Sequence, residues 1–323
     1  MKAYVLKRLL LMVPTLLGAA FLVFLLMRLV PGDICQIRLS GGGAFTSHEA
    51  LAQCRAEIGL DEPFVTQFVG WISNFMVGDF GKSMWTGRPV AQEIAGRLAV
   101  SIQVALMATI LAVASALPMG VLAAIRQNSW IDYGIRLVAI GGIATPSFWL
   151  GILMIVALLN WTQAFTGTAW MPPIDYVPLW KDPLYNLSML IWPALAIGYR
   201  FAAVAMRMTR SSMLEVMRED YVRTARAKGL LEWIVVNRHG LKNALLPVVT
   251  IVGIEFAFLM GGLVVTEQVF NLNGIGRLFV ASVTQQDYTM TQALVMLVVA
   301  IFVVTNFIVD LTYAWLDPRI RYR

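Results

Sequence analysis

Apolar residues in this chain gather in long unbroken runs separated by shorter polar stretches. Six of the runs come near the roughly 20 residues that a helix needs to cross the hydrocarbon core of a bilayer. The short alternating segments that are typical of a membrane β-barrel do not occur. We therefore predict an all-α membrane protein with six transmembrane helices. The predicted spans are Leu9–Val30, Leu98–Ile125, Ile135–Trp161, Leu187–Met208, Leu245–Thr266 and Met290–Tyr313.

Composition agrees with a membrane protein. Of the 323 residues, 59% are hydrophobic and only 14% are charged, whereas a soluble domain carries about a quarter charged residues. The mean hydropathy is +0.71. Helices suit such a chain because they satisfy every backbone hydrogen-bonding group within the segment that crosses the lipid. The first run is too long for a cleaved signal peptide, and the "RLVPGD" that follows lacks a small-residue cleavage site.

Basic residues predict the orientation, because Lys and Arg gather in the short loops on the cytosolic side. Loops 162–186 and 267–289 hold one basic residue each, Lys181 and Arg277. We therefore expect both termini and the 209–244 loop in the cytosol. The net charge of +6 is a signal of topology, and no nucleic-acid partner is expected. The basic residues concerned are Lys2, Lys7, Arg8, Arg319, Arg321 and Arg323 at the termini, and Arg210, Arg218, Arg223, Arg226, Lys228, Arg238 and Lys242 in the loop.

Residues 31–97 are too polar to span a membrane and form a segment predicted to lie outside. This segment contains both cysteines of the chain, Cys35 and Cys54. Disulfides persist in that compartment. The sequence leaves open whether the two residues are bridged or are separate thiols, because it does not show the distance between their Cα atoms.

The loop between the fourth and fifth spans has the signals of a helix. Ser212 is the predicted N-cap, with Glu215 three residues later as in a capping box. Lys228 falls in the last predicted turn, and Gly229 follows as a C′ residue. A second amphipathic stretch, "LEWIVVNRHGLKNALL", leads back to the membrane. The residues that recur at helical spacing, and so form the predicted apolar face, are Met213, Val216, Met217, Tyr221 and Thr224.

Two uses of this loop compete. An amphipathic helix beside basic residues can lie on anionic lipid, or it can dock into a groove on a soluble partner. Small residues, among them Ala225 and Ala227, favour docking because they let a partner approach the backbone closely. Glu219 and Asp220 argue against a face that binds lipid alone. The residues by themselves favour a partner and do not name it.

Two charged residues lie inside predicted spans, Arg200 in the fourth and Glu255 in the fifth. Ionisable groups at this depth are costly, so they face the bundle interior, water or each other. We predict that they line a translocation path or pair across it. The alternatives are a structural polar contact between helices, or an Arg200 side chain that reaches the inner face.

Ordered blocks along nearly the whole chain resemble the permease subunits of the bacterial ABC importers for dipeptides, oligopeptides and nickel. The blocks are "RLLLMVPTLLG", "RLVPGD", "GLDEPF", "GDFGKS", "GRPV", "GVLAA", "TPSFWLGI", "RMTRSSMLEV", "YVRTARAKGL", "NALLPVVT", "NGIGRLF" and "DPRIR". The resemblance implies the type I ABC importer permease fold. It divides the chain into residues 1–96, the transmembrane domain 97–317 and a cytosolic tail 318–323.

In that family the loop helix enters a cleft on a cytosolic ATPase and transmits its motion to the spans. The partners implied are a second, related permease chain, two ATPase subunits and an extracytoplasmic solute-binding protein, in the bacterial inner membrane. ATP and Mg would be bound by the ATPases, with no cofactor in this chain. The residues of this sequence predicted to couple to the ATPase are Glu219, Asp220, Tyr221, Arg223, Thr224, Ala225, Arg226, Ala227, Lys228 and Gly229.

Other classes of protein find less support in the sequence. No G-x-x-x-x-G-K-[ST] motif occurs, so the chain has no phosphate-binding loop of that kind. Two histidines, His48 and His239, exclude a histidine cluster, so we expect no metal site and no enzyme. Rivals are a secondary transporter and a membrane scaffold or sensor. Peptides are the first expected solute, and a nickel chelate, glutathione, an opine or a sugar stay open.

Overall fold

The structure is a computed structural model that describes residues 2–29, 35–36, 39, 47–57, 61–172 and 175–316. This part of the chain is helical, without a strand, and its only β-type pairing is an isolated bridge between Lys82 and Pro89. Six helices in it are long and apolar enough to cross a membrane, which confirms the predicted number. They are α1 (Lys2–Leu29), α5 (Val90–Ile125), α7 (Ser147–Thr166), α8 (Pro183–Val216), α11 (Lys242–Gly262, continuous with the helical turns before it) and α14 (Tyr288–Leu316).

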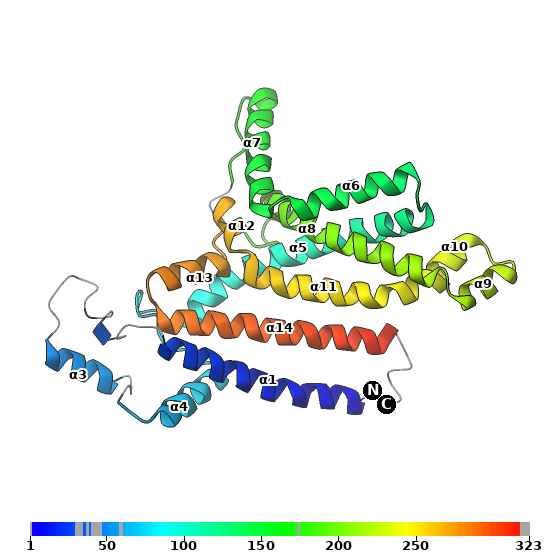
Figure 1. Ribbon diagram of the computed structural model, residues 1–323. Coiled ribbons are helices and arrows are strands. Elements are labelled where there is room, and N and C mark those ends of the chain that lie inside the picture. Colours follow the sequence, from blue (N-terminus) through cyan, green and yellow to red (C-terminus); the bar gives the residue numbers. More distant parts are fainter. Residues whose placement is uncertain are drawn as a thin grey trace.

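These helices run side by side except α7, which stands away from the others (Figure 1). α1 packs against α14, α14 against α11, and α8 against both α11 and α5. The start of α1 and the end of α14 lie at the same end of the bundle as α9 (Asp220–Ala227) and α10 (Glu232–Ile234). The opposite end carries α3 (His48–Glu57), α4 (Phe64–Met76), α12 (Val264–Val269) and α13 (Ile275–Thr284). The two ends of the bundle therefore differ in construction.

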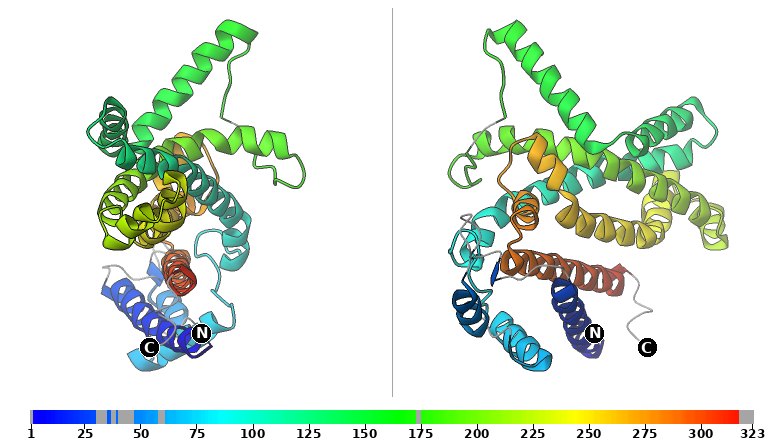
Figure 2. Two further views of the ribbon diagram at one scale, coloured as in Figure 1. Left: turned by 90° about the vertical axis from the view of Figure 1, so that its right-hand side faces the viewer. Right: turned by 60° about the vertical axis from the view of Figure 1, so that its left-hand side comes forward.

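The third predicted span, Ile135–Trp161, is wrong as a single helix. The structure divides it into α6 (Trp130–Ala144) and α7, with Thr145 and Pro146 in extended conformation between them. Proline lacks a backbone N–H and disfavours helical geometry in the residue before it, so α6 ends there. α7 then leaves the bundle at a steep angle (Figure 2). The apolar pattern could not reveal this break because both helices are hydrophobic.

Small residues let α8 approach α5 closely. A Cβ atom added to Gly120 of α5 would lie 2.6 Å from the Cβ of Thr209 and 2.9 Å from the carbonyl oxygen of Met206, both on α8. A Cβ on Gly198 of α8 would lie 3.1 Å from the carbonyl oxygen of Ala108. Membrane helices associate by such close packing, because lipid supplies no hydrophobic driving force between them.

Aromatic rings attach the segment after α1 to the end of that helix. Phe24 of α1 packs edge-on against Phe64 and Phe68 of α4, with ring centroids 5.3 and 5.5 Å apart, and Trp71 lies 5.6 Å from the same ring. The sequence left open whether Cys35 and Cys54, in the same segment, are bridged. In the structure they are joined by a disulfide, with 5.8 Å between their Cα atoms.

A buried carboxylate joins α13 to α5 at this end. Glu267 is 1% exposed and accepts hydrogen bonds from the Ser101 hydroxyl (2.6 Å) and from the backbone N–H of Arg277 (2.8 Å). The Ser101 oxygen in turn accepts from the N–H of Ile275 (2.9 Å). These bonds satisfy N–H groups in the first turn of α13, which have no partner within the helix. Burial raises the pKa of the Glu267 carboxyl.

The contact at Gly120 generates a prediction. Gly120→Ala should destabilise the protein by about 1–3 kcal/mol, the usual cost of forcing a methyl group into a filled site. Gly96→Ala on the same helix is the matched control, because a Cβ there meets no atom within 4 Å. Thermal unfolding in detergent would compare the two variants. Equal melting temperatures would contradict close packing at Gly120.

Candidate functional site

The predicted N-cap at Ser212 is wrong. α8 continues without interruption from the bundle to Val216, and Ser212 lies inside it, 6% exposed. The residues just before it are held in the helix by packing, since Thr209 is fully buried where α8 meets Gly120. Tertiary packing therefore overrides a capping-box pattern that is valid only where a helix begins.

The loop helix begins later than predicted, and its faces are rotated as a result. α8 ends at Val216, and α9 starts at Asp220 after a short turn. The inward side chains of α9 are Val222 and Ala225, which pack against Val235. Tyr221 and Thr224, predicted on the apolar face, are exposed. The interruption changes the helical register, so a periodicity counted from Met213 does not carry through to α9.

Nearly all the predicted coupling residues share the exposed surface of α9 and its ends. Ala225 is the exception, at 5% exposed, because its small side chain lets α9 lie against the following helical segment. The sequence missed Val222 and Val235, which hold α9 in place from within. The exposed residues, which we name the α9 surface, are Glu219, Asp220, Tyr221, Arg223, Thr224, Arg226, Ala227, Lys228 and Gly229.

Polar contacts connect the α9 surface to residues 232–243, the segment that leads back into the bundle and that we name the return segment. The Arg226 guanidinium donates two hydrogen bonds to the Glu232 carboxylate, at 2.7 and 3.1 Å. The Tyr221 hydroxyl accepts from the side-chain amide of Asn243 at 2.7 Å. Gly229 has φ of +75°, the left-handed conformation expected of a C′ residue, which confirms the predicted end of the helix. These contacts hold α9 against the segment that follows it.

A turn of π-helix leads the chain back into the bundle. It covers Val235–Leu241 and runs directly into α11. Within it Gly240 faces Met217 at the end of α8, where an added Cβ would lie 2.9 Å from the methionine sulfur. Since the same turn packs against α9 and α8 and continues into α11, direct contacts connect α9 with both α8 and α11.

An ion pair between the buried Asp132 and the partly buried Arg210 connects α6 to α8 near this end. Asp132 is fully buried and receives two hydrogen bonds of 2.7 Å from the Arg210 guanidinium. It also accepts from the Asn128 backbone, while the Ser129 oxygen accepts from the Asp132 N–H. The hydrogen bonds from Arg210 hold the pKa of the Asp132 carboxyl below its ordinary value. The sequence analysis missed this pair, although Ser129 and Asp132 in "SWID" match a capping pattern.

Arg200 and Glu255 lie on neighbouring helices, near the middle of α8 and in α11. The guanidinium nitrogen and the carboxylate oxygen are 3.6 Å apart, so the two residues form an ion pair. The Arg200 side chain is 53% exposed and that of Glu255 is 16% exposed. The pair is therefore accessible from one side of the bundle. Among the described residues, no group of three or more His, Cys, Asp or Glu side chains could hold a metal ion.

These features define a multi-pass helical membrane protein that holds one polar helix clear of its spans. A family model described as "Binding-protein-dependent transport system inner membrane component" matches residues 116–322. A second model, for the N-terminal part of such components, matches residues 1–105. The chain belongs to this family and is a permease subunit of an ABC importer. The first of these regions ends at residue 105 and the other begins at residue 116.

Relatives of this chain are similar along its whole length. A putative peptide transport system permease protein of Brucella abortus (strain 2308) is 42% identical over 323 residues, which is 100% of both chains. A glutathione transport system permease protein of Salmonella choleraesuis is 41% identical over 321 residues, or 99% of both chains. These relatives and this chain therefore match without a large insertion or an unmatched domain.

The Asp132–Arg210 pair should stabilise the protein. Asp132→Asn should cost about 1.5–3 kcal/mol, the range for hydrogen bonds to a charged group, because the partly buried Arg210 guanidinium loses its charge partner. Asp220→Asn, which removes an exposed pair with Arg223 at 3.2 Å, should cost less than about 1 kcal/mol. Because the pKa of Asp132 is lowered, its contribution is present at neutral pH and is lost as the pH falls through that value. Thermal unfolding at pH 7 tests the difference, and equal losses would contradict it.

Proposed function

We propose that this chain is one of two permease subunits of an ATP-driven peptide importer in the bacterial inner membrane. The observation that carries the proposal is its identity of 41–42%, over essentially the full length, to permease proteins named for peptide and glutathione transport. A peptide or a peptide-like compound is therefore the preferred solute. A nickel chelate, an opine or a sugar is the alternative.

Both termini and the α9 surface are proposed to face the cytosol. The start of α1, the end of α14 and α9 share one end of the bundle, which supports a common side (Figure 1). The same loop is rich in arginine and lysine, as cytosolic loops are. The opposite end, with α3, α4, α12 and α13, would then face a solute-binding protein.

The α9 surface is proposed to dock into a cytosolic ATPase. Its polar side chains are exposed, while Val222 and Ala225 are already buried within the chain, so any partner would contact the polar face. Close contacts of the return segment with α8 and α11 supply a physical route for motion. ATP and Mg would be bound by two ATPase subunits, and this chain would be non-catalytic.

A second permease chain is proposed to complete the translocation path. α7 stands away from the bundle with exposed Phe148, Trp149, Ile152 and Leu153, which would pack against lipid or another chain. The partly exposed Arg200–Glu255 pair would then face the path between the two permeases. A secondary transporter is the rival function. It would need no ATPase and would leave the rigidly held α9 surface without a role.

Purification of the tagged protein in mild detergent tests the proposal directly. Two ATPase copies and one different permease chain should be retained and counted by mass spectrometry. Ala227→Trp should abolish ATPase retention, because the indole projects from the small-residue side of α9. Gln127→Trp, in the exposed turn before α6, should retain the ATPases and serves as the control. A wild-type chain that purifies alone, or as a homodimer without ATPase, would support the secondary transporter instead.

The ion pair makes a separate prediction. Glu255→Gln should lower uptake of labelled peptide into proteoliposomes about tenfold, equivalent to roughly 1.4 kcal/mol, because Arg200 would lose its charge partner beside the path. Asp310→Asn is the control, since it removes another interhelical ion pair, which joins α14 to Arg8 of α1 at 3.0 Å. Unchanged uptake by Glu255→Gln, at normal assembly, would make the pair a structural contact only.

A further inference from the structure

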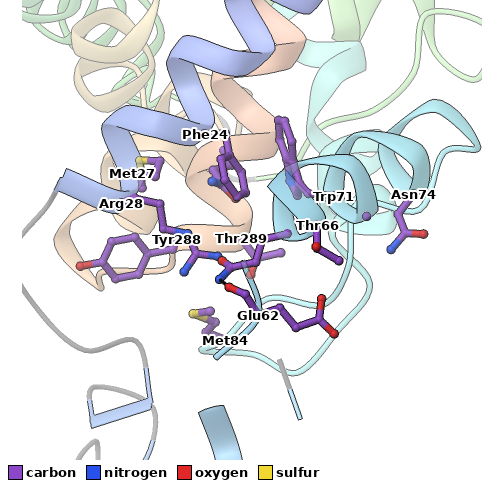
Figure 3. Close-up of a pocket in the computed structure, with 13 residues that line it drawn as sticks. Phe24, Met27, Arg28, Glu62, Thr66, Trp71, Asn74, Met84, Tyr288 and Thr289 are labelled. Atoms are coloured by element: carbon purple, nitrogen blue, oxygen red, sulfur yellow. Dashed lines mark hydrogen bonds between the residues drawn. The ribbon is translucent and has the colours of Figure 1, made fainter. Parts of the chain in front are cut away.

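A pocket lies between α1, α4 and the start of α14, remote from the α9 surface and from the Arg200–Glu255 pair. Its volume is about 370 Å³. Figure 3 shows Arg28 extending from the last turn of α1 among side chains from α4 and from the start of α14. The residues that line the pocket are Phe24, Met27, Arg28, Glu62, Thr66, Gln67, Gly70, Trp71, Asn74, Met84, Tyr288, Thr289 and Gln292.

Among the described residues, the charged side chains that line this pocket have no ionic partner. Arg28 lies over the Phe24 ring, with 5.1 Å from its guanidinium carbon to the ring centroid. Within the described residues, neither Arg28 nor Glu62 takes part in an ion pair. A cation and an anion that line one cavity without pairing suit a ligand that carries both charges. The amides and hydroxyls around them, among them Asn74 and Thr66, supply neutral hydrogen-bonding groups.

The position of the pocket identifies the class of ligand. Arg28 is at the end of a membrane-crossing helix, the depth at which lipid headgroups lie. α4 is amphipathic and contains no buried residue, and it exposes Val65, Val69 and Met76. Helices of this kind lie in the membrane interface, where tryptophan is also enriched. Trp71 of α4 lines the pocket. The surroundings are therefore those of a lipid headgroup.

We propose that this pocket binds the headgroup of a zwitterionic phospholipid. The phosphate binds to the Arg28 guanidinium, which is suited to bidentate contacts with phosphate oxygens. The ammonium lies on the side of the Glu62 carboxylate. The acyl chains follow the apolar surface of α1, where Leu17 and Phe21, on the same helical face as Phe24 and Arg28, are exposed. Only the assignment of this lipid to the outer leaflet rests on the proposed orientation of the chain. The site itself does not depend on that orientation.

Lipid binding to the purified, delipidated transporter complex tests the site by native mass spectrometry. The probes are phosphatidylethanolamine, phosphatidylglycerol, diacylglycerol and inorganic phosphate. We expect one tightly held phosphatidylethanolamine, with diacylglycerol and inorganic phosphate at least about tenfold weaker, the effect expected from losing a charged hydrogen bond or the apolar contacts. Arg28→Gln should weaken phosphatidylethanolamine to a similar degree. Arg88→Gln, an exposed arginine at the same end, should leave it unchanged.

The ammonium contact has its own test. Glu62→Gln should weaken phosphatidylethanolamine and leave phosphatidylglycerol unchanged. Equal effects on both lipids would overturn the zwitterionic assignment, and displacement of the lipid by millimolar inorganic phosphate would indicate a free-phosphate site instead.

Two further outcomes would overturn the site. They are diacylglycerol binding as tightly as phosphatidylethanolamine, and wild-type affinity in Arg28→Gln. If Arg28→Gln does not assemble, Arg28→Lys and the wild-type probe series decide. A chain that purifies without ATPases would contradict the proposed function but would still allow this measurement.

Discussion

The close contact between α5 and α8 is the interaction on which the rest of the structure depends. Gly120 and Gly198 bring the two backbones together along the bundle, and Thr209 is fully buried at one of these contacts. Because this packing keeps α8 helical to Val216, α8 extends past the bundle and sets the position of everything that follows. Arg200, Arg210 and the base of α9 are all placed by this one helix.

At the end that carries α9, buried contacts connect neighbouring elements. The Asp132–Arg210 pair fixes α6 to α8, and the buried Val222 and Ala225 fix α9 to the π-helical turn. The apolar side chains of α9 are already covered within the chain. A force on its exposed polar face would therefore act on a helix that is held in place by its own packing. This arrangement suits the proposed docking of α9 to a cytosolic ATPase.

The opposite end is joined differently, by capping and by aromatic packing. Glu267 and Ser101 hold the first turn of α13 against α5, while Phe24 joins α1 to α4. The lipid pocket lies at this junction, between a span and an interfacial helix. A bound headgroup there would link α1, α4 and α14, three elements that are far apart in the sequence.

The sequence by itself determined the class of protein, the number of spans and the position of the polar loop. Runs of apolar residues and clusters of arginine indicate these features whatever the arrangement of the helices. It also determined the end of α9 at Gly229, since a left-handed C′ residue is a local requirement. Only the tertiary structure decided that Ser212 lies within a helix and that Arg210 pairs with Asp132. These depend on which helices touch, and contacts between segments 78 residues apart leave no local pattern to count.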